Sequence, residues 1–227
     1  MVQDKLVWKM FLVLHDPFTG KPEVGQDLMK SSLVASELSD LIMSRHLGME
    51  DDHVVVAGTG GLESDEIATF VAHSIDQQPG SHTVRNWIRA LGDTVYEMVA
   101  GLAVQTGTVR RQPAAWRPTG RRADRFPAVD LLRAAGPRLR LEHKLRTPRE
   151  LDLETSVLAG VLGSLRLERV IDVQRDRAAV KAAVAAAAAA LPIDLRNLLS
   201  GVEAAGDASS SFGHGSPIGP MRRRDRG

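Results

Sequence analysis

The sequence predicts a mainly α-helical protein, built as a single compact helical domain with a protruding β-hairpin. Apolar residues recur at helical spacing through most of the chain. Short runs rich in proline, glycine and charged residues separate these segments. One such run, residues 109–127, contains a Pro118-Thr119-Gly120 turn between two short arms, which is typical of a hairpin.

The first half of the chain contains five predicted helices and one extended segment. Residues 6–14 have helical apolar spacing, and the HDPFTGKP sequence ends that run. The HVVVAG segment, residues 53–58, is expected to be a short strand or extended piece. The remaining helices are expected at residues 27–47, from a Ser64 cap to about residue 74, from Ser81 or Thr83 through VRNWIRALG, and at residues 94–105.

The second half contains helical segments followed by a polar tail. Helices are expected at residues 129–135, 150–171 and 174–191, the last from its alanine-rich composition. Pro192 should stop that helix, and we expect IDLRNLLSG to add one last short turn. From Gly201 the chain is rich in Gly, Ser and Ala and ends in MRRRDRG. We therefore expect a helical domain over residues 1–200 and a disordered tail over residues 201–227.

Charge is distributed unevenly along the chain, although the formal net charge is only +1. Residues 1–108 contain 7 Lys/Arg and 15 Asp/Glu (−8), and residues 109–149 contain 12 and 3 (+9). Residues 150–227 contain 10 of each. A protein polarised in this way can orient on an anionic partner. The predicted hairpin holds six of the arginines: Arg110, Arg111, Arg117, Arg121, Arg122 and Arg125.

We interpret these arginines as a lipid- or anion-binding surface, with Trp116 and Phe126 as membrane or oligomer anchors. Three alternatives stay open. The segment is a solvated basic loop, or it binds protein (a second copy or a client), or it is the wing of a winged helix that binds nucleic acid. The helix over residues 94–105 would then enter the major groove. It has no Arg or Lys and contains Glu97, so nucleic acid is the less favoured partner.

The residues offer no support for several other kinds of site. With no cysteine, the chain has no disulfide, thiolate nucleophile or cysteine-based zinc site. The seven histidines show no HxxxH or HExxH spacing, and no nucleophile stands with a partnered base. We therefore expect no metal, no cofactor and no catalytic residue. No apolar run approaches the roughly 18–20 residues that span a bilayer, and the start lacks signal-peptide features, so we expect a cytoplasmic protein associated peripherally with membranes.

Several segments together resemble the Golgi phosphoprotein 3-like family, which includes bacterial proteins. The resemblance extends over about residues 3–200. Arginine outnumbers lysine 23 to 6 and alanine is abundant, a composition that favours a bacterial member. The segments that carry the resemblance are KLVWKMFLVLHDPFTGKP, SSLVASELSDLIMSRHL, HVVVAG, VRNWIRALG, VYEMVAGLAVQTGTVRR with RFPAVD, and TSVLAGVLGSLRLERVI.

The resemblance implies a helical domain whose hairpin self-associates, which binds phosphatidylinositol 4-phosphate on Golgi membranes, and which acts as an adaptor for glycosyltransferases. In the family a tryptophan and three arginines form the headgroup pocket. The corresponding positions here are Gly25, Val34, Asp93 and Tyr96. None of the four residue types is kept, and Asp93 would oppose a phosphate group. The sequence therefore predicts adhesion to anionic lipid through the hairpin rather than selection of one headgroup.

Overall fold

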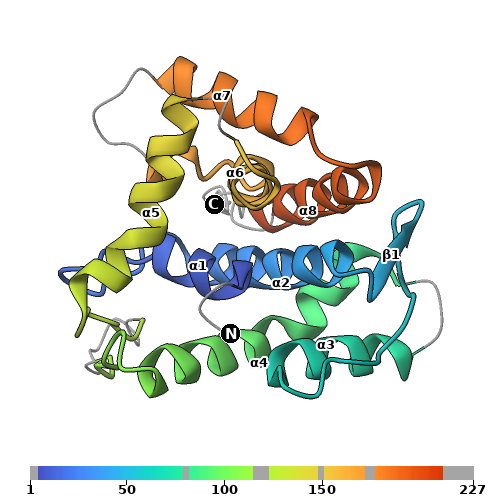
Figure 1. Cartoon of the computed structure of the whole chain (residues 1–227), viewed down its shortest axis with the longest axis horizontal. Coiled ribbons are helices and arrows are strands. Elements are labelled where there is room, and N and C mark those ends of the chain that lie inside the picture. Colours follow the sequence, from blue (N-terminus) through green and yellow to red (C-terminus); the bar gives the residue numbers. More distant parts are fainter. Residues whose placement is uncertain (1–4, 79–81, 115–122, 148–150, 172–176, 212–227) are drawn as a thin grey trace, which may run out of the picture.

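The computed structural model describes residues 5–78, 82–114, 123–147, 151–171 and 177–211 (Figure 1). These residues are mainly α-helical and include a β-hairpin, so the predicted fold class is confirmed. The elements are α1 (Leu6–Val13), α2 (Gln26–Met43), β1 (Leu47–Glu50), β2 (His53–Val56), α3 (Glu66–Asp76), α4 (Val84–Gln105), α5 (Leu131–Arg146), α6 (Leu153–Ser164), the 3-10 helix η3 (Glu168–Val170), α7 (Arg177–Ala189) and α8 (Ile193–Ser211).

The helices α1 and α2 form the centre of the molecule. They lie between α3 and α4 on one side and α6 and α8 on the other (Figure 1). Every residue of α1 is buried, including Lys9, whose Nζ pairs with Glu154 at 2.6 Å. The buried serines of α2 are satisfied locally, since Ser36 and Ser39 each donate to the carbonyl four residues earlier. Asp40 of α2 accepts a hydrogen bond from the backbone N–H of Leu6 at 2.7 Å and so caps α1.

The sequence predicted two helices where the structure has the single helix α4. Gly92 lies at the predicted break, but the helix continues through it. A β-carbon at Gly92 would lie 3.1 Å from the β-carbon of Lys30, so glycine allows α4 to approach α2 closely. The second half of α4 buries Val95, Val99 and Ala103. A helix committed to the core in this way does not present that face to a DNA groove.

The C-terminal boundary of the folded region also differs from the prediction. We expected a short turn followed by disorder from Gly201, but α8 continues to Ser211. Its apolar residues Leu195, Leu198 and Val202 are buried at helical spacing. A β-carbon at Gly201 would lie 2.7 Å from Val84, so this glycine permits close packing of α8 on α4. Residues 212–227, the rest of the predicted tail, lie outside the described residues.

Other boundaries moved by smaller amounts. The cap of α3 is Asp65, which accepts from the backbone N–H of Ala68 at 3.0 Å, and not Ser64. Helix α5 was expected to end at Ala135, but it continues through Pro137 to Arg146. The predicted helix over residues 150–171 ends at Ser164 and is followed by η3. Helix α5 runs along one edge of the molecule, across the layers (Figure 1).

Two antiparallel pairings among the described residues bear on the predicted hairpin. Strands β1 and β2 pair antiparallel from Leu47 opposite Val56 to Glu50 opposite His53. The arms of the predicted hairpin also run antiparallel, with bridges between Val109 and Ala128 and between Gln112 and Arg125. Its base is therefore present as predicted, and its tip, residues 115–122, lies outside the described residues. We call residues 109–128 the basic hairpin.

Candidate functional site

The register of the basic hairpin divides its arginines between two faces. Gln112 and Arg125 exchange both backbone hydrogen bonds, at 2.8 and 2.9 Å, and the N–H of Arg110 donates to the carbonyl of Pro127 at 3.0 Å. Because side chains alternate across a strand, Arg110, Gln112 and Arg125 share one face. Arg111 lies on the other face with Phe126, the residue opposite it. Arg110 and Arg125 are exposed.

Arg111 is held by carboxylates on the inner face. Its Nε donates to Oδ2 of Asp124 at 2.7 Å, and its two terminal nitrogens donate to Glu97 at 2.7 and 3.1 Å. Hydrogen bonds to Glu97 and Asp124 raise the pKa of the Arg111 guanidinium, which therefore stays charged. Asp124 also accepts from the N–H of Ala114 at 3.0 Å. Arg111 therefore joins the hairpin base to α4, and two carboxylates match its charge although its side chain remains 37% exposed.

Phe126 belongs to the core and not to the surface. Its exposed fraction is 1%. The ring meets Phe11 edge-on at a centroid distance of 5.1 Å and His15 at 5.3 Å. Burial lowers the pKa of His15 to about 4, so its imidazole is neutral at pH 7. The proposed anchor role of Phe126 is wrong, because an insertion into lipid would remove it from this aromatic cluster.

The remaining predicted site residues lie outside the described residues. They are Trp116, Arg117, Arg121 and Arg122. Their roles in charge and anchoring stay predictions. The described residues bring together Arg110 and Arg125 of the predicted surface, on one exposed face.

Sequence reasoning missed the contribution of α5, which begins three residues after the hairpin. The helix carries five basic residues against Glu142: Arg133, Arg138, Arg140, Lys144 and Arg146. Arg138 forms ion pairs with two carboxylates: its Nη1 lies 2.5 Å from Oε1 of Glu23, and its Nε lies 3.3 Å from Oε1 of Glu142. Arg133 and Arg140 are exposed. The +9 charge of residues 109–149 indicated a basic surface that extends beyond the hairpin. Because the helix was predicted to end at Ala135, its basic residues after that position were not assigned to it.

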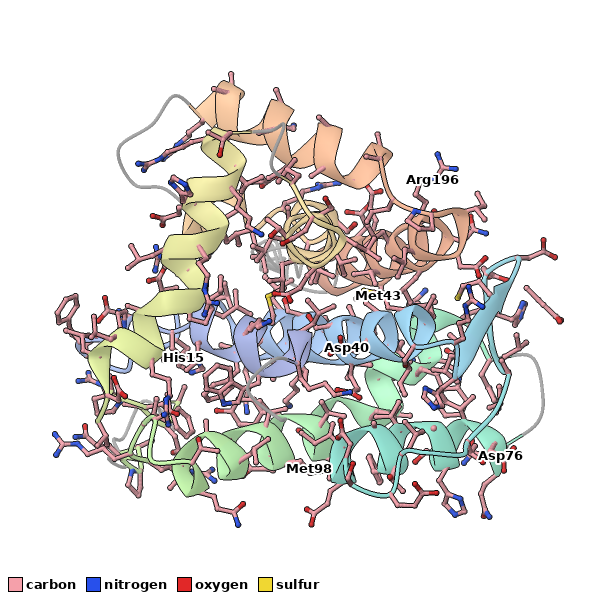
Figure 2. The ribbon with its side chains drawn as sticks, viewed as in Figure 1. His15, Asp40, Met43, Asp76, Met98 and Arg196 are labelled. Carbon is pink, nitrogen blue, oxygen red and sulfur yellow. The ribbon has the colours of Figure 1, made fainter. Side chains whose placement is uncertain are left out.

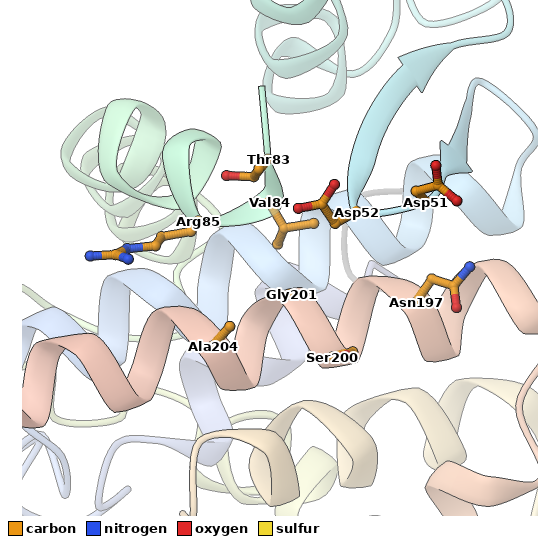
Figure 3. Close-up of a pocket in the computed structure, with 9 residues that line it drawn as sticks. All are labelled: Asp51, Asp52, Thr83, Val84, Arg85, Asn197, Ser200, Gly201 and Ala204. Carbon is orange, nitrogen blue, oxygen red and sulfur yellow. The ribbon is translucent and has the colours of Figure 1, made fainter. Parts of the chain in front are cut away.

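A cleft lies where the turn between β1 and β2 meets α4 and α8 (Figure 3). Asp51, Asp52, Arg85 and Asn197 are among its lining residues. The two carboxylates of Asp51 and Asp52 outnumber the one guanidinium of Arg85, so the cleft does not attract an anion. It is therefore not a second candidate for a lipid headgroup.

The described residues contain no helix that is both long enough and apolar enough to cross a bilayer. Within the same part of the chain, no three His, Cys, Asp or Glu side chains are grouped as metal ligands.

The comparison with protein families shows which family the chain belongs to. The family model for Golgi phosphoprotein 3 (GPP34) matches residues 6–204. The chain belongs to this family. A search of curated proteins found no match. The GPP34 match extends from α1 into α8, and it includes the basic hairpin and α5.

The four positions implied for the GPP34 headgroup pocket do not form a cationic site. Val34 is fully buried and Tyr96 is 8% exposed. Gly25 is the N-cap of α2. Asp93 pairs with Lys30, Nζ to Oδ1 at 2.5 Å, so the nearby cation is neutralised. A phosphate monoester is bound by several charge-assisted hydrogen bonds, which these side chains do not supply.

Proposed function

We propose that this GPP34 protein is a non-enzymatic peripheral membrane protein that binds anionic phospholipid through the outer face of the basic hairpin. The observation that carries the proposal is the register that places Arg110 and Arg125 together on the exposed face. The exposed cations of α5 extend this positive surface beyond the hairpin. The remaining hairpin arginines, Arg117, Arg121 and Arg122, would add to it.

The magnitudes favour reversible adhesion. A basic residue close to an anionic leaflet contributes about 1 kcal/mol of binding free energy. At 0.1 M salt this attraction is largely screened beyond a separation of about 10 Å. Arg111 is left out of this sum, because its charge is matched by Glu97 and Asp124. A handful of outward arginines therefore supports binding that is strong at low salt and weak at high salt. Headgroup charge, and not headgroup identity, would set the affinity.

Co-sedimentation with vesicles tests the proposal. We expect binding to phosphatidylcholine vesicles that contain phosphatidylglycerol and none to phosphatidylcholine alone. The double variant R110E/R125E should bind at least about tenfold more weakly, because each reversal replaces an attraction with a repulsion. Equal binding of this variant and the wild-type protein would overturn the proposal.

The matched control is the double variant R85E/R196E, which changes net charge by the same amount. Arg85 is in the first turn of α4, and α4 spans about 33 Å before the hairpin begins. Arg196 lies on α8, at the end of the molecule away from α5 (Figure 2). A loss of binding in this control equal to that of R110E/R125E would mean that net charge acts without a defined surface.

The family resemblance also implies self-association and an adaptor role. We propose that self-association and the adaptor role accompany membrane binding. Light scattering of the wild-type protein with and without vesicles tests the first, since a mass that rises only on vesicles would link assembly to the lipid surface. A constant monomer mass on and off vesicles would reject self-association.

A further inference from the structure

Helix α5 exposes leucines on the side that faces away from the protein. Its buried residues Ala134, Leu141 and Leu145 define the inner side. Leu132 and Leu139, seven residues apart, lie about half a turn away from that side. They are 86% and 59% exposed. Helix α5 therefore has an apolar stripe about 10 Å long that no described residue covers.

Basic residues flank this stripe. Arg133 and Arg140 directly follow the two leucines, and both are exposed. Arg133 donates to the carbonyl of Thr106 at 3.3 Å, which ties the start of α5 to the end of α4. Apolar residues flanked by arginines on a surface helix are typical of helices that lie in the interfacial region of an anionic bilayer.

Two further apolar residues extend the stripe toward the hairpin. Phe18 is 74% exposed and Val129 is 63% exposed. The carbonyl of Pro17 accepts from the N–H of Ala128 at 3.0 Å, so the turn that bears Phe18 is fixed beside the residue that precedes Val129. Asp16 holds the turn closed by accepting from the N–H and the hydroxyl of Thr19, both at 2.7 Å. Phe18 is thus presented on a fixed turn. We call Phe18, Val129, Leu132 and Leu139 the exposed apolar face.

We infer that the exposed apolar face inserts into the interfacial region of the same anionic bilayer that the basic hairpin contacts. The inference rests on the proposed function. The charges decide the occupant, because Arg140 beside Leu139, and Arg110 and Arg125 on the adjoining hairpin, match anionic headgroups around an apolar centre. Arg133 adds less, since it lies 3.8 Å from the carboxylate of Asp130. The arginines supply attraction to the surface, and the apolar side chains then enter it.

A fluorescent label measures insertion directly. The chain has no cysteine, so Leu132→Cys gives one site for an environment-sensitive dye. Ile193→Cys is the matched control, since Ile193 is 58% exposed at the start of α8, away from α5. On phosphatidylglycerol-containing vesicles, the dye at position 132 should shift to shorter wavelength and be quenched by spin-labelled lipid. The dye at position 193 should do neither.

Unlabelled variants provide a second measurement. L132S/L139S should bind these vesicles about tenfold more weakly, equivalent to about 1.4 kcal/mol, and I193S should bind like the wild-type protein. Full sedimentation without a wavelength shift at position 132 would overturn insertion and leave adhesion standing. An unchanged affinity of L132S/L139S would do the same. Failure of the wild-type protein to sediment would overturn both proposals.

Discussion

Arg111 and Glu97 form a two-point ion pair that joins the basic hairpin to α4. Nη1 of Arg111 lies 2.7 Å from Oε2 of Glu97, and Nη2 lies 3.1 Å from Oε1. The guanidinium carbon also lies 5.7 Å from the centre of the Phe126 ring. Arg111 is therefore a structural residue, while the side chain of its neighbour Arg110 is exposed.

Arg111→Ala should lower the free energy of unfolding by about 1–2 kcal/mol, because it removes hydrogen bonds to two carboxylates from a half-exposed guanidinium. Arg110→Ala, the adjacent exposed residue, should change it by less than about 0.5 kcal/mol. Urea unfolding followed by circular dichroism measures both. Equal effects of the two substitutions would contradict the division of the hairpin into two faces.

Phe126→Ala should destabilise the protein by about 3–5 kcal/mol, because it opens a cavity beside Phe11 and His15. Phe18→Ala, on the exposed turn, should leave unfolding almost unchanged and weaken binding to anionic vesicles. Phe126→Ala should therefore change unfolding, and Phe18→Ala should change vesicle co-sedimentation. If Phe126→Ala left the unfolding midpoint unchanged, the aromatic cluster would not be part of the core.

Glu37 predicts a pH-dependent stability. Its side chain is fully buried, and neither carboxyl oxygen has a hydrogen-bond partner among the described residues. Burial, with Asp40 and Asp65 nearby, raises its pKa to about 8 despite the charge of Lys5. The folded protein therefore holds a proton that the unfolded chain releases above about pH 4.5. This contribution to stability is complete below pH 4.5 and is lost as the pH rises to about 8.

Glu37→Leu should remove that loss, because leucine fills a similar volume without a buried carboxyl group. We expect the variant to gain stability relative to the wild-type protein as the pH rises from 5 to 8. Unfolding of both proteins at several pH values gives the difference between their free energies of unfolding. Groups that titrate alike in both proteins cancel in this difference. Asp40 is the exception, because burial raises its pKa to about 6 and it lies close to Glu37. A difference independent of pH would show that Glu37 is ionised in the folded protein.

The headgroup of the lipid should not matter at matched surface charge. The positions of the implied family pocket hold Val34 in the core and Asp93 in a pair with Lys30. Vesicles containing phosphatidylinositol 4-phosphate and vesicles containing phosphatidylglycerol, adjusted to equal surface potential, should therefore bind equal amounts of protein. A tenfold preference for phosphatidylinositol 4-phosphate would require a headgroup site elsewhere on the surface.

The sequence predicted the helical core because its signals are local. The apolar residues of α1 and the periodic burial of Val84, Trp87 and Leu91 in α4 follow from spacing alone. The break predicted at Gly92 was wrong, since the reason for that glycine is Lys30 on another helix. The same holds for Gly201 in α8, where the closest atoms belong to Val84. Close approach between distant segments has no signature in either segment.

The sequence predicted the positive charge of the basic hairpin but not the direction in which each arginine points. Counting arginines located the basic hairpin but gave Arg110 and Arg111 the same role. The two-residue alternation of Val109, Arg111 and the opposing Phe126 was present in the sequence and could have separated them. What the sequence did not contain was the position of Glu97, fourteen residues away, which decides that Arg111 is paired.

Salt-dependent co-sedimentation of the wild-type protein is the most direct measurement of the central claim. On phosphatidylcholine vesicles with added phosphatidylglycerol, we expect the bound fraction to be high at low ionic strength and to fall steadily as salt is added, with no binding to phosphatidylcholine alone. The absence of binding to the anionic vesicles at low salt would contradict the account.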